Sequence, residues 1–166
     1  MPYATATELL DRFDAEEIAQ RTDRSTPRLV TAELLRAAAA GGDLSAWADD
    51  EQAAAVAALS LINGALADAD NTIDGYLAVR YAVPLASPPA VVKRLACDLA
   101  RYFLYDDQAT ETVQKRYDAA ERFFREVGAG KLSLGVDLGA AAQPAGGTVE
   151  IVSGGSVFGR SDKGFI

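Results

Sequence analysis

The sequence contains no histidine, and this absence restricts its chemistry more than any residue that is present. Histidine is the commonest general base and the commonest metal ligand in proteins. Imidazole-based catalytic triads and most zinc sites are therefore excluded. The single cysteine, Cys97, can form no disulfide within the chain, which is consistent with a reducing compartment. Since it lies beside Asp98 with no histidine to activate it, Cys97 is predicted to be a small packed residue rather than a nucleophile.

Basic residues are also scarce. The 166 residues include 16 Lys and Arg against 24 Asp and Glu, which gives a formal charge of −8. Phosphate binding requires clustered basic side chains, so this balance argues against an electrostatic grip on nucleic acid. Most of the excess negative charge lies in residues 41–80.

No apolar run reaches the length of a membrane span. The longest, Ala53–Ala67, is interrupted by Ser60 and Asn63 and falls short of the ~20 residues that a spanning helix needs. The first residues lack the apolar segment of a signal peptide. The sequence therefore predicts a soluble protein that is not secreted, has no membrane partner and forms one globular domain.

What the sequence does contain is helical periodicity. A long helix is predicted from Asp49 to about Arg80; Gly64 and Gly75 lower its helix propensity, which allows a bend or a break near residues 71–75. Its apolar side chains recur at spacings of three and four on one stripe, made of Val56, Leu59, Ile62, Leu66, Ala69, Ile73 and Leu77.

Shorter helices are predicted around this long one. They cover residues 7–13, 15–20, 29–40 and 110–127, with another beginning at Pro88 and Pro89. Thr5 and Glu8 have the spacing of a capping box, and Trp47 is predicted to anchor the loop over residues 43–48 on the core. The predicted fold is thus mainly α, a small helical bundle around one long helix, with a helical domain over residues 1–127.

Residues 128–166 have a different composition. They hold 10 of the 14 glycines, few charges and no helical period. The prediction is an extended C-terminal arm with a short β-strand or hairpin at 149–157, which gains order by docking on another surface. Its candidate interface residues are Val149, Ile151, Val157, Phe158, Arg160 and Phe165.

Two stretches have the start of a ligand-binding motif and lack the rest. Residues 70–75 begin like a calcium loop, but the twelfth position, where a bidentate glutamate is needed, is Tyr81. Residues 128–131 are similar to a phosphate loop without its first glycine or its Ser/Thr, so a helix end followed by a turn is predicted instead. No catalytic, cofactor or metal residue is assigned, and no enzyme activity is expected.

The most distinctive motif is IDGYLAVRYAVPL, residues 73–85. Aromatic, charged and apolar side chains are crowded there, and Asp74, Tyr76, Arg80 and Tyr81 are its candidate interface residues. Tyr and Arg are enriched at binding hot spots. The structural alternative stays open: Ile73, Leu77 and Tyr81 are equally suited to a core.

This motif, together with YATATELLDRFDAEEIAQ, LACDLARYFLYDD, KRYDAAERFFREVGAGKLSLG and FGRSDKGF, resembles the head-tail connector (head-completion adaptor) proteins of Mu-like phages and prophages. The resemblance implies a ring-forming virion protein beneath the portal protein, at the head-tail junction, made in the bacterial host cytoplasm. It implies contacts with other copies of the chain, with the portal protein and with a tail-side completion protein, while DNA passes without specific binding. The other interpretation is a cytoplasmic helical protein-binding or regulatory module with no place in a particle.

Overall fold

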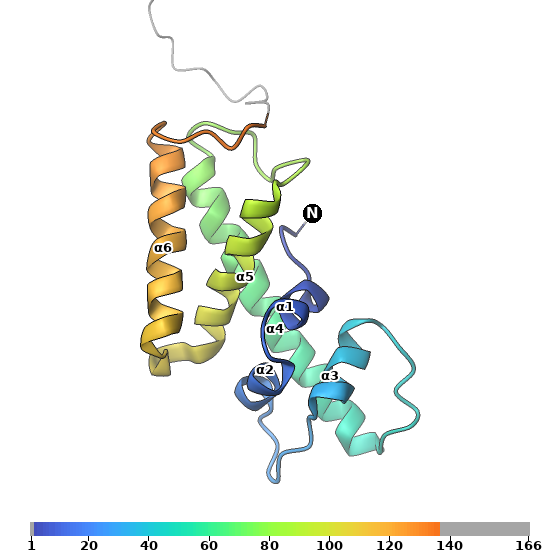
Figure 1. Ribbon diagram of the computed structural model, residues 1–166. Coiled ribbons are helices and arrows are strands. Elements are labelled where there is room, and N and C mark those ends of the chain that lie inside the picture. The colour runs from blue at the N-terminus through green and yellow to red at the C-terminus, as the bar shows by residue number, and fades with distance from the viewer. Residues whose placement is uncertain (1, 137–166) are drawn as a thin grey trace, which may run out of the picture.

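The computed structural model describes residues 2–136, and all of the arm residues named above lie outside this range. The described part is helical and contains no strand, which confirms the predicted fold class (Figure 1). Its elements are α1 (Ala6–Arg12), α2 (Ala15–Thr22), α3 (Ala32–Ala39), α4 (Asp49–Leu77), α5 (Ala90–Tyr105), the short 3-10 helix η1 (Asp106–Gln108) and α6 (Glu111–Gly128).

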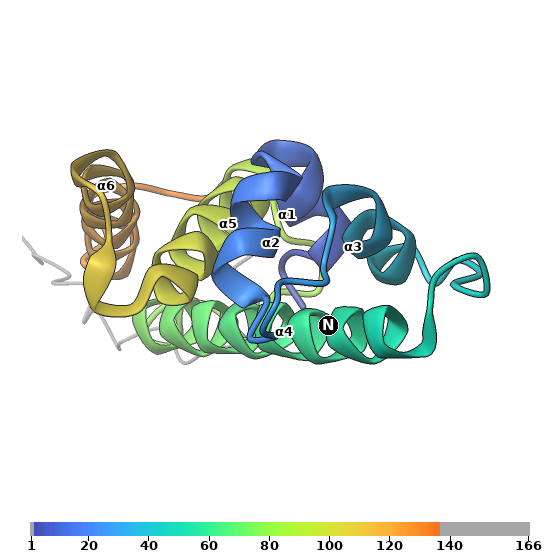
Figure 2. The same cartoon turned by 90° about the horizontal axis from the view of Figure 1, so that it is seen from below.

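The long helix α4 contacts every other α-helix of the described chain. The three short helices α1–α3 pack along its first part, and α5 and α6 pack toward its end (Figures 1 and 2). Figure 2 shows α1 and α2 on one side of the molecule and α4 on the opposite side. One helix therefore organises the fold, and within residues 2–136 one of its faces is left uncovered. We call this the outer face; Ala53, Ala57, Ser60 and Gly64 are exposed on it.

The buried face of α4 follows the predicted stripe with a correction at its start. Ile62, Ile73 and Leu77 are fully buried, but Val56 is 59% exposed, so its assignment to the core stripe was wrong. Ala55 and Ala58 take the inward positions instead. Because alanine is apolar on either face, the alanine-rich start of α4 does not fix the direction of the stripe.

α4 is continuous through residues 71–75, so the bend or break considered at these residues does not interrupt the helix. It ends at Leu77 rather than near Arg80. By length and composition alone, α4 is long and apolar enough to cross a membrane, and no other helix in residues 2–136 is. Core helices of soluble proteins pass the same test.

Side-chain caps set the beginnings of the short helices. The predicted capping box is present: Glu8 N donates to Thr5 Oγ1 at 3.2 Å, and Thr5 N donates to Glu8 Oε2 at 2.8 Å. The prediction that a helix starts at residue 29 was wrong, because Asp23 accepts the amides of Leu29 and Val30 at 2.7 and 2.8 Å. These bonds hold the chain extended until Thr31 caps α3.

Asp23 is a buried carboxylate with a clear structural role. Burial alone would raise its pKa, but hydrogen bonds from the Ser25 hydroxyl and from the amides of Val30, Ser25 and Leu29 lower the pKa to about 2. The charged form therefore organises the turn between α2 and α3.

Two other predictions about single residues are confirmed. Trp47 is partly buried and packs against a small cluster of Leu34, Ala38 and Ala55, so it anchors its loop. Cys97 is 3% exposed, and burial raises the pKa of its thiol to about 11. A thiol in this state is a packed apolar residue.

Candidate functional site

The IDGYLAVRYAVPL motif covers the last turn of α4 and the segment after it. Ile73 and Leu77 are fully buried and Tyr81 is 1% exposed, so the core alternative holds for these three. Asp74, Tyr76 and Arg80 are partly exposed. We call Asp74, Tyr76, Arg80 and Tyr81 the α4 clamp, because together they hold the N-terminal segment, α6 and the segment after α6.

Asp74 holds the N-terminal segment through Tyr3. The Tyr3 hydroxyl donates to Asp74 Oδ1 and accepts the Leu85 amide at 3.0 Å, while the Tyr3 amide donates to Asp70 Oδ1 at 3.1 Å. Burial, followed by the hydrogen bond to Asp74, raises the pKa of Tyr3, so it stays a donor. Asp74 thus joins residues 3 and 85 to the end of α4.

Tyr76 holds α6. Its hydroxyl donates to Glu121 Oε1 at 2.7 Å, and Arg125 Nη2 lies 2.8 Å from the same oxygen. The hydrogen bond to Glu121 raises the pKa of Tyr76. At the end of α6, a Cβ on Gly128 would lie 2.7 Å from the Tyr76 carbonyl oxygen, so only glycine allows this close approach of the two backbones.

Arg80 and Tyr81 hold the segment that follows α6. Arg80 Nη1 donates to the carbonyl oxygens of Val127 at 3.3 Å and Leu132 at 3.4 Å. The Tyr81 hydroxyl accepts the amide of Leu134 at 3.2 Å, and Leu134 is 9% exposed. Residues 129–136 are therefore fastened to the helical domain, and the α4 clamp fixes the point from which the remaining chain continues.

Within residues 2–136, groups of the two motif fragments make hydrogen bonds to other parts of the chain. The carboxylates of Asp70 and Asp74, which begin the calcium-like stretch, are bound by Tyr3. In the phosphate-like stretch, the amides of Gly130 and Lys131 donate to the carbonyls of Val127 and Glu126, as the predicted helix end requires. Residues 2–136 contain no group of three acidic or cysteine side chains placed to hold a metal ion.

Sequence reasoning missed Tyr3, Asp70 and Glu121 as members of this arrangement. Tyr3 and Asp70 are 67 residues apart, and periodicity within one helix carries no information about such contacts. Asp70 was considered only as the first position of a calcium-like loop. The proposed partner contacts of Asp74, Tyr76 and Arg80 stay a prediction, whereas the buried ring of Tyr81 can act on a partner only through the segment that it holds.

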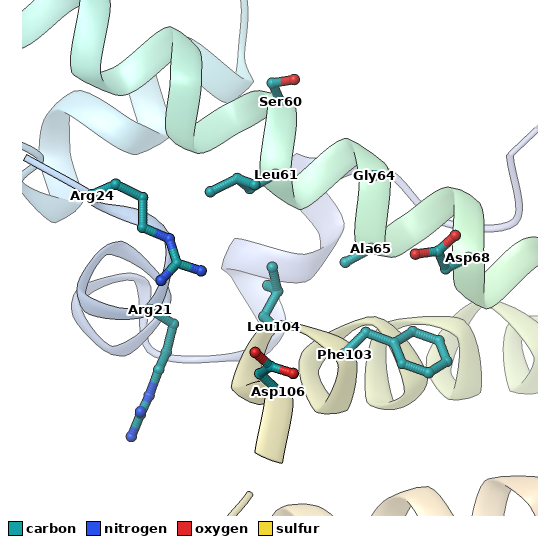
Figure 3. A pocket seen from close by; sticks show the side chains of 10 residues that line it. All are labelled: Arg21, Arg24, Ser60, Leu61, Gly64, Ala65, Asp68, Phe103, Leu104 and Asp106. Carbon is teal, nitrogen blue, oxygen red and sulfur yellow. The ribbon is translucent and has the colours of Figure 1, made fainter. Parts of the chain in front are cut away.

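A shallow hollow of about 270 Å³ lies between α2, α4 and the end of α5 (Figure 3). Leu61, Gly64 and Asp68 border it on α4, and Leu104 and Arg24 lie on the other side. Arg21, which also borders it, stacks on the Tyr105 ring at 4.2 Å. The absence of a side chain at Gly64 leaves this edge of α4 open.

Together, the fold and the α4 clamp define a class of protein: a small all-α domain whose polar side chains fasten chain segments to one central helix. Comparison with known proteins identifies the family within this class. The family described as Bacteriophage Mu, Gp36 matches residues 3–153, and the chain belongs to this family. It is a Mu-like phage protein.

Two relatives show the extent of the similarity. The Mu-like prophage FluMu protein gp36 of Haemophilus influenzae is 41% identical over 106 residues, which cover 63% of this chain and 75% of the relative. Gene product J of Escherichia phage Mu is 42% identical over 103 residues, which cover 61% of this chain and 73% of the relative. The resemblance to a Mu-like phage family is thereby confirmed.

Proposed function

We propose that this protein is a structural component of the virion, a head-tail connector that forms a ring beneath the portal protein. In this role it contributes to the DNA exit channel and offers a docking surface to a tail-side completion protein. The observation that carries the proposal is the membership of a Mu phage family over residues 3–153. Its place is the head-tail junction, after synthesis in the host cytoplasm.

Two features of the described chain support this role. The first is the acidity of α4, which has six acids and no basic residue and, within the described residues, leaves its outer face uncovered. An acidic wall repels phosphates and lets DNA pass without binding. The second is the α4 clamp, which fixes the start of the C-terminal segment on a rigid helix end. A segment held at its base is suited to reach a neighbouring subunit or the portal protein.

The direct test is a prophage from which this gene is deleted. We expect induced cells to contain DNA-filled heads and free tails but no joined particles, with joined particles restored by the wild-type gene in trans. Mass spectrometry of purified virions should detect the protein. Normal virion yield from the deletion, or absence of the protein from virions, would overturn the proposal and favour the cytoplasmic binding module.

The C-terminal segment has its own test. Deletion of residues 146–166 is expected to leave the thermal unfolding of the helical domain unchanged, because the α4 clamp holds residues up to 136. The truncated chain is expected to lose ring formation or portal binding in electron microscopy of the purified proteins. If the truncated chain forms normal rings on the portal, the arm makes no contact that assembly requires.

A further inference from the structure

Basic side chains gather in one groove of this acidic protein. We call it the arginine groove; it has a volume of about 360 Å³, lies between α1, α5 and α6, and is bordered by Arg12, Arg94, Leu95, Asp98, Arg116, Ala119 and Phe123. Three guanidinium groups meet one carboxylate there, although the whole chain has a net charge of −8. The hollow shown in Figure 3, by contrast, has two arginines and two aspartates at its border. The arginine groove therefore carries an excess of positive charge.

Asp98 holds two of these arginines together. Arg12 Nε and Arg116 Nη1 each lie 3.7 Å from Asp98 Oδ1, which is inaccessible to solvent and accepts no hydrogen bond from the described residues. The Phe13 ring adds a second restraint, because both guanidinium groups also lie over it, at 5.7 and 5.8 Å from its centroid. Asp98 is thus an internal counter-charge. It opposes one positive charge of three and is itself out of reach of an occupant.

Arg94 supplies the third positive charge. Its side chain is exposed, and among the described side chains it forms no ion pair. A guanidinium group presents several N–H donors in one plane and binds carboxylates with two parallel hydrogen bonds. The basic border of the groove is therefore suited to carboxylates brought by another molecule.

Apolar side chains make up the rest of the groove. Leu95 is 5% exposed, Phe123 is partly buried and Ala119 is exposed. An apolar surface beside arginines is typical of the centre of a protein–protein interface, where Arg and aromatic residues are enriched. The phosphates and sugars of a DNA backbone offer no apolar side chain to cover such a surface. The groove is thus better suited to a protein than to nucleic acid.

We propose that the arginine groove is a docking site for an acidic segment of another protein, in which an apolar side chain is flanked by carboxylates. The apolar side chain covers the apolar part of the groove, and the carboxylates bind the guanidinium groups of Arg12, Arg94 and Arg116. Charge complementarity determines this choice, because the buried Asp98 leaves two positive charges unopposed. The site does not require the connector role, and its test needs neither a ring nor a portal protein.

Peptide binding to the full-length protein tests this site. The probe is a fluorescein-labelled peptide with one phenylalanine between two pairs of glutamates, and its binding is followed by fluorescence anisotropy at low salt. Glutamine in place of every glutamate is expected to raise the dissociation constant by about tenfold or more, because the charge-assisted hydrogen bonds are lost. Alanine in place of the phenylalanine is expected to raise it by about fivefold, because less apolar surface is buried.

The protein variant is Arg94→Glu, which is expected to raise the dissociation constant of the glutamate peptide by about tenfold. Its matched control is Arg122→Glu, the same charge change at an exposed arginine of α6 that does not border the groove. The control is expected to bind the peptide like the wild type. Circular dichroism verifies that both variants are folded.

Three results would overturn the proposal. The first is absence of binding of the glutamate peptide to the wild type, and the second is an equal loss of affinity in the two variants. The third is tighter binding of a labelled DNA duplex than of the peptide, weakened by Arg94→Glu and not by Arg122→Glu, which would identify a nucleic-acid site instead.

Discussion

The two faces of α4 use similar residues for different purposes. On the inner face, Ile62, Ile73 and Leu77 are fully buried, and so is Ala58. On the outer face, Ala57 is exposed, although it is adjacent to Ala58 in sequence. The inner face is constrained by packing against five helices, whereas the fold places no such demand on the outer face. Composition on the outer face is therefore free to serve contacts outside the chain.

The largest difference between the faces is expected from loss of apolar side chains. Ile73→Ala should lower the free energy of unfolding by about 2–5 kcal/mol, because it removes a fully buried side chain and leaves a cavity. Val56→Ala, at the edge of the outer face, should change it by less than about 0.5 kcal/mol, since Val56 is 59% exposed. Urea unfolding followed by circular dichroism measures both values. Equal losses would mean that the outer face is packed in the free protein.

A smaller effect is expected where α4 holds the N-terminal segment. Tyr3→Phe removes the hydroxyl that joins Asp74 to the Leu85 amide, and Leu85 is 5% exposed. The buried amide is left without a partner, so a loss of about 1–3 kcal/mol is expected in the same assay.

The control for Tyr3 is Tyr102→Phe, whose hydroxyl forms no hydrogen bond with any described residue. It should leave stability within about 0.5 kcal/mol of the wild type. A Tyr3→Phe variant as stable as this control would show that the α4 clamp contributes no stability through Asp74.

How far the sequence predicts this comparison depends on the range of the interactions. Helix positions and the inner residues Ile62 to Leu77 follow from periodicity, because they are local properties. Val56 was misplaced because alanines surround it and make the apolar stripe ambiguous. The bonds of Tyr3 to Asp70 and of Tyr76 to Glu121 join segments 67 and 45 residues apart, so no local pattern predicts them.

The choice of Asp74, Tyr76 and Arg80 as site residues was made from residue types alone. Those types identified a real concentration of polar contacts, but the contacts that the structure describes lie within the chain. Residue type indicates that a side chain is engaged and does not indicate with what.

Replacing glycine by alanine adds one methyl group and so tests exposed and closely packed positions with the same change. Gly64→Ala on the outer face should stabilise the free protein by up to about 1 kcal/mol, because its Cβ meets open space and alanine is the better helix former. Gly128→Ala should destabilise it, because that Cβ lies 2.7 Å from the Tyr76 carbonyl oxygen. Thermal unfolding measures both changes.

The smallest expected effect is a pH dependence at Asp70, which lies between the two faces of α4. Burial raises the pKa of Asp70 above its usual 3.8, and the hydrogen bond from the Tyr3 amide opposes this only in part. A carboxyl whose pKa rises on folding binds its proton more tightly in the folded state. Its contribution to stability is therefore greatest below pH 3.8 and is lost as the pH rises through the raised value.

Asp70→Asn removes this titration and keeps an oxygen that can accept the Tyr3 amide. The difference in unfolding free energy between variant and wild type should therefore shift in favour of the variant as the pH rises above 3.8. Urea unfolding between pH 3 and pH 7 measures this difference; a difference that does not change with pH would show that Asp70 has the same pKa in the folded and the unfolded chain.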